Sequence, residues 1–285
     1  MNSDKVVNQL RKWAKFNDVV RAVVLTSSRS DNTNATVDQF SDYDVVVYVN
    51  SLDDFRNDDW LPFFGKILVK WPLKPESEFG ENWLTRLVIF ENRTRIDFQI
   101  TTDTHTPPFD YDLGYLVIID KDGFTKNFPK ATKTKHLIQK PTQQEFLEMV
   151  NAFFWDATYI PKYLYREDLF YTNYMFEVDL RFSHFEKMIE WYIGSQHNWT
   201  VNTNVHGRLF PKYLDNVTWN NIKETFAGAN TKDVWNAFFK LVKVFTSLAR
   251  VVAEKCEYPY PKAQEKKMLH YFQKSKEMFD NKTSL

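Results

Sequence analysis

The spacing of apolar residues changes once along this 285-residue chain, near Lys140. Before that point, apolar residues form short runs of Val, Ile, Leu, Phe and Tyr, bounded by polar segments or by Pro and Gly, as is typical of β-strands. After it, apolar residues recur every three or four positions, as on the buried face of an α-helix. We therefore predict an α+β protein, with an N-terminal domain built on a mixed β-sheet and a C-terminal α-helical bundle.

The domain boundary is expected near Pro141. Thr142 and Glu145 have the spacing of a capping box, in which the two residues exchange side-chain-to-backbone hydrogen bonds at the start of a helix. We assign residues 1–138 to the sheet domain and 139–285 to the helical domain. Strands are expected at residues 21–26, 43–49, 66–71, 84–91, 94–101 and 115–120, and helices at 1–16 and 53–64.

Composition excludes several classes of protein. Lys plus Arg and Asp plus Glu both number 37, so the basic excess typical of nucleic-acid coat proteins is absent, and no nucleic-acid partner is expected. The single cysteine, Cys256, excludes intramolecular disulfides and cysteine-rich zinc sites. Only seven glycines occur, without a GxGxxG or GxxxxGK[ST] motif, which disfavours Rossmann and P-loop enzymes.

Membrane insertion and export are also disfavoured. No stretch approaches the roughly 18 consecutive apolar residues of a membrane-spanning helix. The first residues, MNSDKVVNQLRKWAKF, carry charges throughout and lack the apolar core of a signal peptide. We therefore expect a cytoplasmic protein with no membrane partner.

One pattern of polar residues carries chemistry. Ser27, Ser28 and Arg29 follow the first strand candidate, and Asp42 and Asp44 open the second as a D-x-D motif. Side chains alternate along a strand, so the two aspartates point the same way. Two carboxylates at that spacing suit oxygen-ligated divalent cations such as Mg²⁺.

A third carboxylate, Asp97, lies in a strand candidate whose other members are largely apolar. An acid there costs desolvation free energy unless a cation or hydrogen-bond donors meet it. Three aspartates on adjacent strands can hold two Mg²⁺ ions about 4 Å apart, an arrangement that serves in-line displacement at phosphorus. The Ser-Ser-Arg turn would then bind a triphosphate through its N–H groups, hydroxyls and guanidinium.

Each part of this pattern also has a simpler explanation. A D-x-D that begins a strand is more often a solvated edge or a turn, and Asp97 could face solvent on an edge strand. The three parts in this order, inside a mixed α/β half, are much more specific than any of them alone.

In this order the motifs resemble those of the aminoglycoside 6-adenylyltransferases (streptomycin adenylyltransferases), within the DNA polymerase β-type nucleotidyltransferase superfamily. The resemblance covers nearly the whole chain. It rests on these stretches: Ser27-Ser28-Arg29, Asp42-Tyr43-Asp44, Gly80-Glu81-Asn82-Trp83, Ile96-Asp97-Phe98, and, in the helical half, Trp155, Tyr159, Lys162, Leu164 and Arg166.

The resemblance implies transfer of AMP from ATP to a hydroxyl of an aminoglycoside, with the 6-OH of streptomycin as the family's acceptor and antibiotic resistance as the outcome. Two Mg²⁺ ions are the implied cofactors, ATP is the co-substrate, and a monomer is expected. Asp42, Asp44 and Asp97 are implied as metal ligands and catalytic residues, with Asp97 either ligating metal or accepting the proton of the sugar hydroxyl.

Further roles follow from the same resemblance. Ser27, Ser28 and Arg29 would bind the ATP phosphates. Lys162 and Arg166 stand four residues apart, hence on one helix face, and would reach the β- and γ-phosphates. The alternative for that pair is an ordinary solvated face.

The acceptor pocket is less sharply defined. Trp83 and Trp155 are candidates for its lining, with core packing as the simpler alternative. Asp179 and Glu186 are weak candidates among the acidic residues that could bind a polycationic acceptor.

The chain departs from the family pattern at Ser27, where glycine is usual. Glycine permits positive φ and close approach of a phosphate; serine could adopt the same turn with strain, or weaken nucleotide binding. Two other functions therefore stay open: a nucleotidyltransferase with a different acceptor, such as another antibiotic or a metabolite, and a degenerate nucleotide-binding module without catalysis. The retained Asp42, Asp44 and Asp97 argue against the second.

Overall fold

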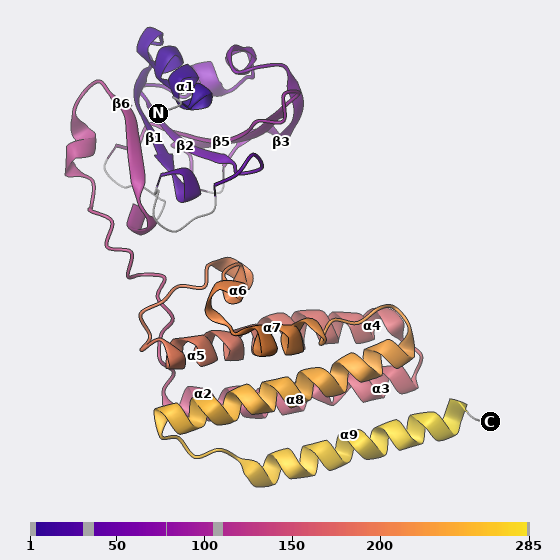
Figure 1. Cartoon of the computed structure of the whole chain (residues 1–285). Coiled ribbons are helices and arrows are strands. Elements are labelled where there is room, and N and C mark those ends of the chain that lie inside the picture. The colour runs from indigo at the N-terminus through magenta and orange to yellow at the C-terminus, as the bar shows by residue number, and fades with distance from the viewer. Residues whose placement is uncertain (1–3, 31–36, 78, 105–110, 284–285) are drawn as a thin grey trace. The chain divides into compact units, whose positions relative to one another are not determined.

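The computed structural model describes residues 4–30, 37–77, 79–104 and 111–283. The chain divides into two compact units, Met1–Lys135 and His136–Leu285, which are treated separately below (Figure 1). The first unit contains a mixed β-sheet and the second is helical, which confirms the predicted α+β class.

The sheet of the first unit has six strands in the order β3-β4-β5-β2-β1-β6. Strands β2 and β5 are parallel neighbours, and the other neighbouring pairs are antiparallel. All six predicted strands are present, five of them within one residue of the expected ends. Their bounds are β1 (Val20–Thr26), β2 (Tyr43–Val49), β3 (Ile67–Glu76), β4 (Trp83–Phe90), β5 (Arg95–Thr101) and β6 (Tyr115–Asp120).

Strand β3 runs further than predicted. The expectation ended it at Trp71 because Pro72 follows, and proline cannot donate a ladder hydrogen bond. In the structure β3 is an edge strand of the sheet, where proline is tolerated, and its pairing with β4 is irregular between Trp71 and Glu76.

The two faces of the sheet have different covers. Helix α1 (Lys5–Phe16) packs Leu10, Trp13 and Ala14 into the larger core of this unit, together with residues such as Val45 and Phe98 (Figure 1). The opposite face carries a smaller, aromatic cluster that includes Tyr48, Trp83, Tyr111 and Phe128. Because Asp44 and Asp97 alternate with Val45 and Phe98, they lie on the face opposite α1.

The predicted helix over residues 53–64 is wrong. That segment instead forms two short 3₁₀ turns, η2 (Asp53–Phe55) and η3 (Leu61–Phe63). Between them, the carboxylate of Asp58 binds Lys70 and Arg86, so this partly buried residue serves as a counter-charge for the fully buried Arg86. Pro62 supplies no N–H for a continuous helix. The other 3₁₀ turns are η1 (Ser27–Arg29), η4 (Tyr111–Leu113), η5 (Phe124–Asn127) and η7 (Val205–Gly207).

The second unit is a bundle of helices around one aromatic core. Its longest helix, α8, buries residues along much of its length, and Phe245 stacks on Phe153 of α2 with ring centroids 3.5 Å apart. The elements are α2 (Gln143–Ala157), α3 (Tyr159–Tyr165), α4 (Leu169–Tyr174), the π-helical segment η6 (Met175–Phe185), α5 (Glu186–Gln196), α6 (Phe210–Tyr213), α7 (Asn216–Lys223), α8 (Thr231–Cys256) and α9 (Lys262–Thr283).

The predicted capping box begins α2. The Thr142 hydroxyl accepts the Glu145 N–H at 3.2 Å, and the Glu145 carboxylate accepts the Thr142 N–H at 2.7 Å. These bonds satisfy two backbone donors that the first helical turn leaves unpaired. In the part of the chain that the structure describes, no helix is long and apolar enough to cross a bilayer.

Candidate active site

Asp44 and Asp97 lie side by side at the centre of the sheet. The parallel register of β2 and β5 pairs them directly, and adjacent strands are about 4.8 Å apart. Both side chains are partly buried. The sheet therefore places two acidic side chains from distant parts of the sequence next to each other on one face.

The Ser27 turn meets this pair from the other side of β2. The antiparallel register of β1 and β2 pairs Thr26 with Asp44, so the turn η1 begins beside Asp44. The hydroxyl of Ser27 lies close enough to lower the pKa of Asp44. The predicted turn and the predicted carboxylates thus come together in the fold.

Arg95 is the cation of this cluster, and it was not among the site residues predicted from the sequence. Its Nε donates to Asp97 Oδ1 at 2.9 Å and its Nη2 to Asp97 Oδ2 at 2.7 Å. Its Nη1 lies 3.5 Å from Asp42 Oδ2. Arg95 therefore joins two of the three predicted aspartates. Its position two residues before Asp97 on the same strand was the available signal, since residues i and i+2 share a face.

Asp44 lacks such a partner. It forms no ion pair with any other described residue. Burial raises the pKa of Asp44, and the negative charges of Asp97 and Asp42 raise it further; the Ser27 hydroxyl and the Arg95 charge act in the opposite direction. Three carboxylates thus lie near one guanidinium, which contacts two of them, Asp42 and Asp97, and the cluster is short of positive charge.

The donor set suits a divalent cation, although the carboxylates do not form a ready cage. Oxygen ligands are those that Mg²⁺ prefers, and the charge that Asp44 lacks is the one such an ion would supply. Within the described ranges, no three His, Cys, Asp or Glu side chains converge closely enough to hold a metal ion. Arg95 lies between the carboxylates of Asp42 and Asp97 instead.

Ser27 has the backbone conformation that glycine adopts most easily. Its φ is 58°, in the left-handed region, which costs a residue with a side chain about 1–2 kcal/mol. The turn that usually carries glycine is therefore formed here by serine, with strain. Ser28 is partly buried in the same turn.

The guanidinium of Arg29 is occupied by the chain itself. Nε donates to the carbonyl oxygens of Ser41 (3.1 Å) and Asp42 (3.0 Å). Nη2 donates to those of Asp38 (3.1 Å) and Ser41 (2.8 Å). These bonds fix the backbone that leads to Asp42. A phosphate-binding role for Arg29 stays a prediction.

The ring of Tyr43 contacts the guanidinium of Arg29. The guanidinium carbon lies 4.0 Å from the centroid of the Tyr43 ring, a cation–π contact. The Tyr43 hydroxyl donates to the carboxylate of Asp4 at 2.9 Å. Burial and this hydrogen bond raise the pKa of Tyr43 to about 12. The N-cap of α1 is thereby tied to the residue between Asp42 and Asp44.

The predicted cations of the second unit share one helix face. Lys162 and Arg166 are both exposed. Lys162 Nζ lies 5.3 Å from the ring centroids of Tyr159 and of Tyr163, and the Arg166 guanidinium carbon lies 5.5 Å from that of Tyr163. The structure gives them aromatic neighbours and leaves both charges open to solvent.

The two tryptophan candidates differ in exposure. Trp83 is 5% exposed and belongs to the aromatic cluster of the first unit, whereas Trp155 on α2 is 67% exposed. Trp83 is therefore a core residue. Only Trp155 presents its ring to solvent.

The two acidic candidates have separate surroundings. Asp179 lies on η6; burial raises its pKa, as does the charge of Asp156, while His184 acts in the opposite direction. His184 itself lies 2.7 Å from the Asp156 carboxylate. Glu186 begins α5. Burial raises the pKa of Glu186, whereas His206, whose ring nitrogen lies 3.4 Å from the carboxylate, acts to lower it.

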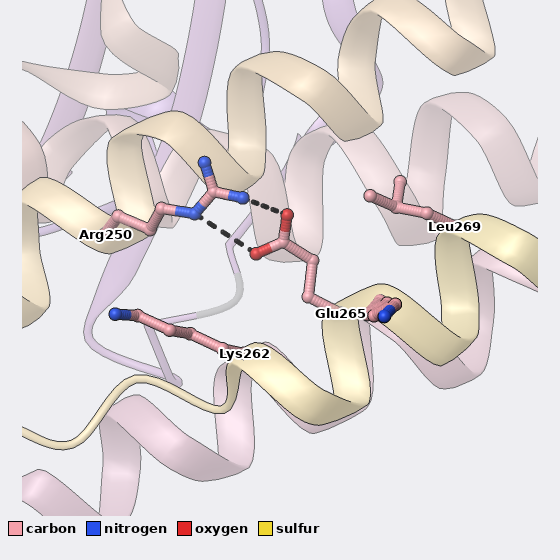
Figure 2. Close-up of a pocket in the computed structure, with 5 residues that line it drawn as sticks. Arg250, Lys262, Glu265 and Leu269 are labelled. Atoms are coloured by element: carbon pink, nitrogen blue, oxygen red, sulfur yellow. Dashed lines mark hydrogen bonds and ion pairs between the residues drawn. The ribbon is translucent and has the colours of Figure 1, made fainter.

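A pocket of about 490 Å³ lies elsewhere in the second unit, between α8 and α9. Figure 2 shows Arg250 paired with Glu265 across it, with Lys262 nearby. Lys266 and Leu269 complete the lining. None of the predicted site residues lines this pocket.

Three comparisons relate the chain to known proteins. The family model described as streptomycin adenylyltransferase matches residues 1–275. A protein of Bacillus subtilis (strain 168) named aminoglycoside 6-adenylyltransferase is 28% identical over 263 residues, 89% of this chain and 90% of that protein. A protein of the same name from Campylobacter jejuni is 28% identical over 274 residues, 93% of each chain. The crystal structure of an aminoglycoside 6-adenyltransferase from Bacillus subtilis has a TM-score of 0.45 and 21% identity, covering 96% of this chain and 99% of that one.

Proposed function

The chain belongs to the streptomycin adenylyltransferase family, and we propose that it transfers AMP from MgATP to a hydroxyl of an aminoglycoside, releasing pyrophosphate. It is a nucleotidyltransferase, since the family match extends through both units. We take streptomycin as the acceptor because the family is described as streptomycin adenylyltransferase, and its 6-OH as the site of transfer because the relatives are named for position 6. Antibiotic resistance would be the outcome.

The observation that carries the proposal is the pairing of Asp44 with Asp97 in the parallel register of β2 and β5, with Asp42 joined to Asp97 through Arg95. Transfer of a nucleotidyl group needs concentrated negative charge that can hold a cation against a triphosphate. An ordinary sheet avoids paired acids, because like charges directly opposite each other destabilise it. Two acids retained at this position therefore favour a function over a structural role.

The three aspartates would have two duties. Asp42, Asp44 and Asp97 would hold Mg²⁺, which supplies positive charge to the phosphates when it is bound. Asp97 would also accept the proton of the acceptor hydroxyl. The hydroxyl oxygen would then bond to the α-phosphorus while the bond from that phosphorus to the pyrophosphate oxygen breaks. Its bidentate contact with Arg95 fixes the orientation of the carboxylate in the absence of substrate.

The nucleotide would be bound by the turn beside Asp44. Backbone N–H groups and hydroxyls of Ser27 and Ser28 would meet the phosphates, with Arg29 holding the turn and the Asp42 backbone together. Lys162 and Arg166 would add positive charge for the β- and γ-phosphates. Their solvent-exposed charges on one helix face support this assignment.

The acceptor would be bound through stacking and ion pairs. Trp155 offers an exposed ring, and Asp179 and Glu186 offer partly buried carboxylates for ammonium or guanidinium groups. Trp83 would contribute only from within the core of the first unit.

Pyrophosphate release by the purified chain with MgATP, with and without streptomycin, tests the proposal. Streptomycin-dependent release that is lost in Asp97→Asn and kept in Asp54→Asn would support it. Asp54 is a matched control because it is an exposed aspartate of the same unit. Pyrophosphate release that occurs only with another acceptor would mean that this molecule, and not streptomycin, is the acceptor. No release with any acceptor, and no Mg²⁺-dependent thermal shift with ATP, would favour the non-catalytic module.

A further inference from the structure

Arg95 engages the same carboxylate oxygens that the proposed function needs. Both oxygens of Asp97 accept hydrogen bonds from it, at 2.9 and 2.7 Å, and Asp42 Oδ2 lies 3.5 Å from its Nη1. While Arg95 is in this position, those oxygens face a guanidinium. A divalent cation bound by the same atoms would need them free.

We propose that Arg95 is a built-in counter-cation of the Asp42–Asp44–Asp97 cluster, which a divalent cation must displace in order to bind. The inference rests on the proposed function only in taking these aspartates as the metal ligands. It assigns Arg95 a positioning role: the side chain partly neutralises the cluster without metal and thereby weakens binding of free metal.

The side chain of Arg95 is placed so that it can leave. Arg95 is the first residue of β5, and its side chain is 42% exposed. Its side-chain contacts are those to Asp97 and Asp42. The strand is anchored by its buried neighbours Ile96 and Phe98, so the guanidinium can swing to solvent without disturbing the core.

Charge explains why such a residue is needed. Asp44 and Asp97 are paired in register, and Asp42 lies close enough to act on Asp44 electrostatically. Without a cation, three carboxylates would repel one another within one partly buried cluster. Arg95 neutralises one of them, and Asp44 forms no ion pair with any described residue. A dication would balance the cluster more completely than the single charge of Arg95.

Competition has a measurable consequence. Because Arg95 and a dication use the same oxygens, each lowers the apparent affinity of the cluster for the other. The wild type would therefore bind free metal weakly and take up its metal together with the nucleotide. Removal of the guanidinium would strengthen metal binding although a residue beside the site has been lost.

The test is a titration of the full-length chain with Mn²⁺ in the absence of nucleotide. Electron paramagnetic resonance measures the free Mn²⁺, and thus the amount bound. We expect Arg95→Gln to bind Mn²⁺ at least about tenfold more tightly than the wild type. Arg95→Lys, which keeps the charge but loses the bidentate contact, should fall between them. Arg93→Gln is the matched control, since Arg93 is an exposed arginine just before the same strand; it should match the wild type.

Thermal stability gives a second readout without catalysis. In EDTA, Arg95→Gln should melt below the wild type, and Mn²⁺ should raise its melting temperature by more than that of the wild type. Mn²⁺ binding by Arg95→Gln that is equal to or weaker than wild type would overturn the proposal, because Arg95 would then help to arrange the ligands. If Arg95→Gln does not fold, Arg95→Lys decides by the same comparison.

Failure of the inference and failure of the proposed function are distinguishable. Tight Mn²⁺ binding by Arg95→Gln would uphold the role of Arg95 even if the wild type adenylylates no aminoglycoside. Conversely, adenylylation by the wild type together with unchanged Mn²⁺ affinity in Arg95→Gln would refute only the role of Arg95.

Discussion

Replacing Asp44 by asparagine should stabilise the metal-free first unit and abolish turnover. Asp44 is a partly buried carboxylate with no ion pair among the described residues, and Asp97 and Asp42 add negative charge around it. Asparagine has nearly the same shape, so Asp44→Asn removes the charge with little change in packing. The same change removes a proposed metal ligand.

The size of the gain follows from the register. Paired residues on adjacent strands lie about 5 Å apart. At an effective dielectric constant of about 20, two negative charges at that distance repel by about 3 kcal/mol. Arg95 offsets part of this, because it neutralises Asp97. We expect a net gain of about 1–2 kcal/mol in the free energy of unfolding, or roughly 3–8 °C for a unit of this size.

The gain should depend on pH. Burial, Asp97 and Asp42 raise the pKa of Asp44 above its ordinary value of 3.8. A carboxyl group whose pKa is raised by folding favours the folded state when protonated, so wild-type stability improves as pH falls through the raised pKa. The advantage of Asp44→Asn should therefore be full at pH 7 and shrink as pH falls toward 3.8.

Asp97→Asn is the internal control, because it relieves the same repulsion but also removes the bidentate contact with Arg95. Its effect on stability at pH 7 should therefore be less favourable than that of Asp44→Asn by about 1–3 kcal/mol. Calorimetric melting in EDTA at neutral and acidic pH, with pyrophosphate release measured in parallel with Mg²⁺, compares the two variants. A lower melting temperature for Asp44→Asn at pH 7, or an advantage that does not change with pH, would refute the electrostatic reasoning.

Three further predictions concern single residues. Ser27→Gly removes a hydroxyl proposed to bind the phosphates and relieves the strain of a φ of 58°, which exists with and without nucleotide; the KM for ATP should therefore rise, and an unchanged or lower KM in steady-state assays would contradict this. Thr142→Ala removes half of the capping box of α2 and should cost about 1 kcal/mol in urea unfolding, with kcat unchanged. Gly194→Ala would bring a Cβ within 2.5 Å of the Trp199 ring and should cost about 1–3 kcal/mol by overpacking; wild-type stability in urea would show that the ring can move.

Local patterns were sufficient to predict most of the fold. Alternating or continuous β-branched runs gave the six strands, and the Thr142–Glu145 spacing gave the start of α2. Residues 53–64 failed because the pattern of apolar residues there resembled a helix. One competing demand came from elsewhere in the chain, since Asp58 pairs with Arg86, and the other is local, since Pro62 interrupts the backbone hydrogen bonds.

The sequence suggested candidate site residues, without Arg95, but it did not suggest their arrangement. The D-x-D spacing places Asp42 and Asp44 on one face from the sequence alone. Strands β2 and β5 are parallel neighbours, with Asp44 opposite Asp97. Along the chain, β3 and β4 stand between them, yet β3 and β4 lie at the edge of the sheet and β5 lies beside β2. No local pattern specifies that register.

Pairings between distant residues were equally hidden. The contact of His184 with Asp156 joins η6 to α2, and the buried state of Trp83 against the exposed state of Trp155 depends on the cores that form around them. Both tryptophans stand among apolar residues in the sequence, and only packing separates their roles.

The chemical product decides whether the chain has the proposed activity. The measurement is the mass and the position of modification of streptomycin after incubation with the purified chain and MgATP. We expect one added adenylyl group on the 6-OH, formed by the wild type and by Asp54→Asn but not by Asp97→Asn. Unmodified streptomycin after incubation with the folded wild type, or an equal yield with Asp97→Asn, would contradict the proposed function and the role assigned to the paired aspartates.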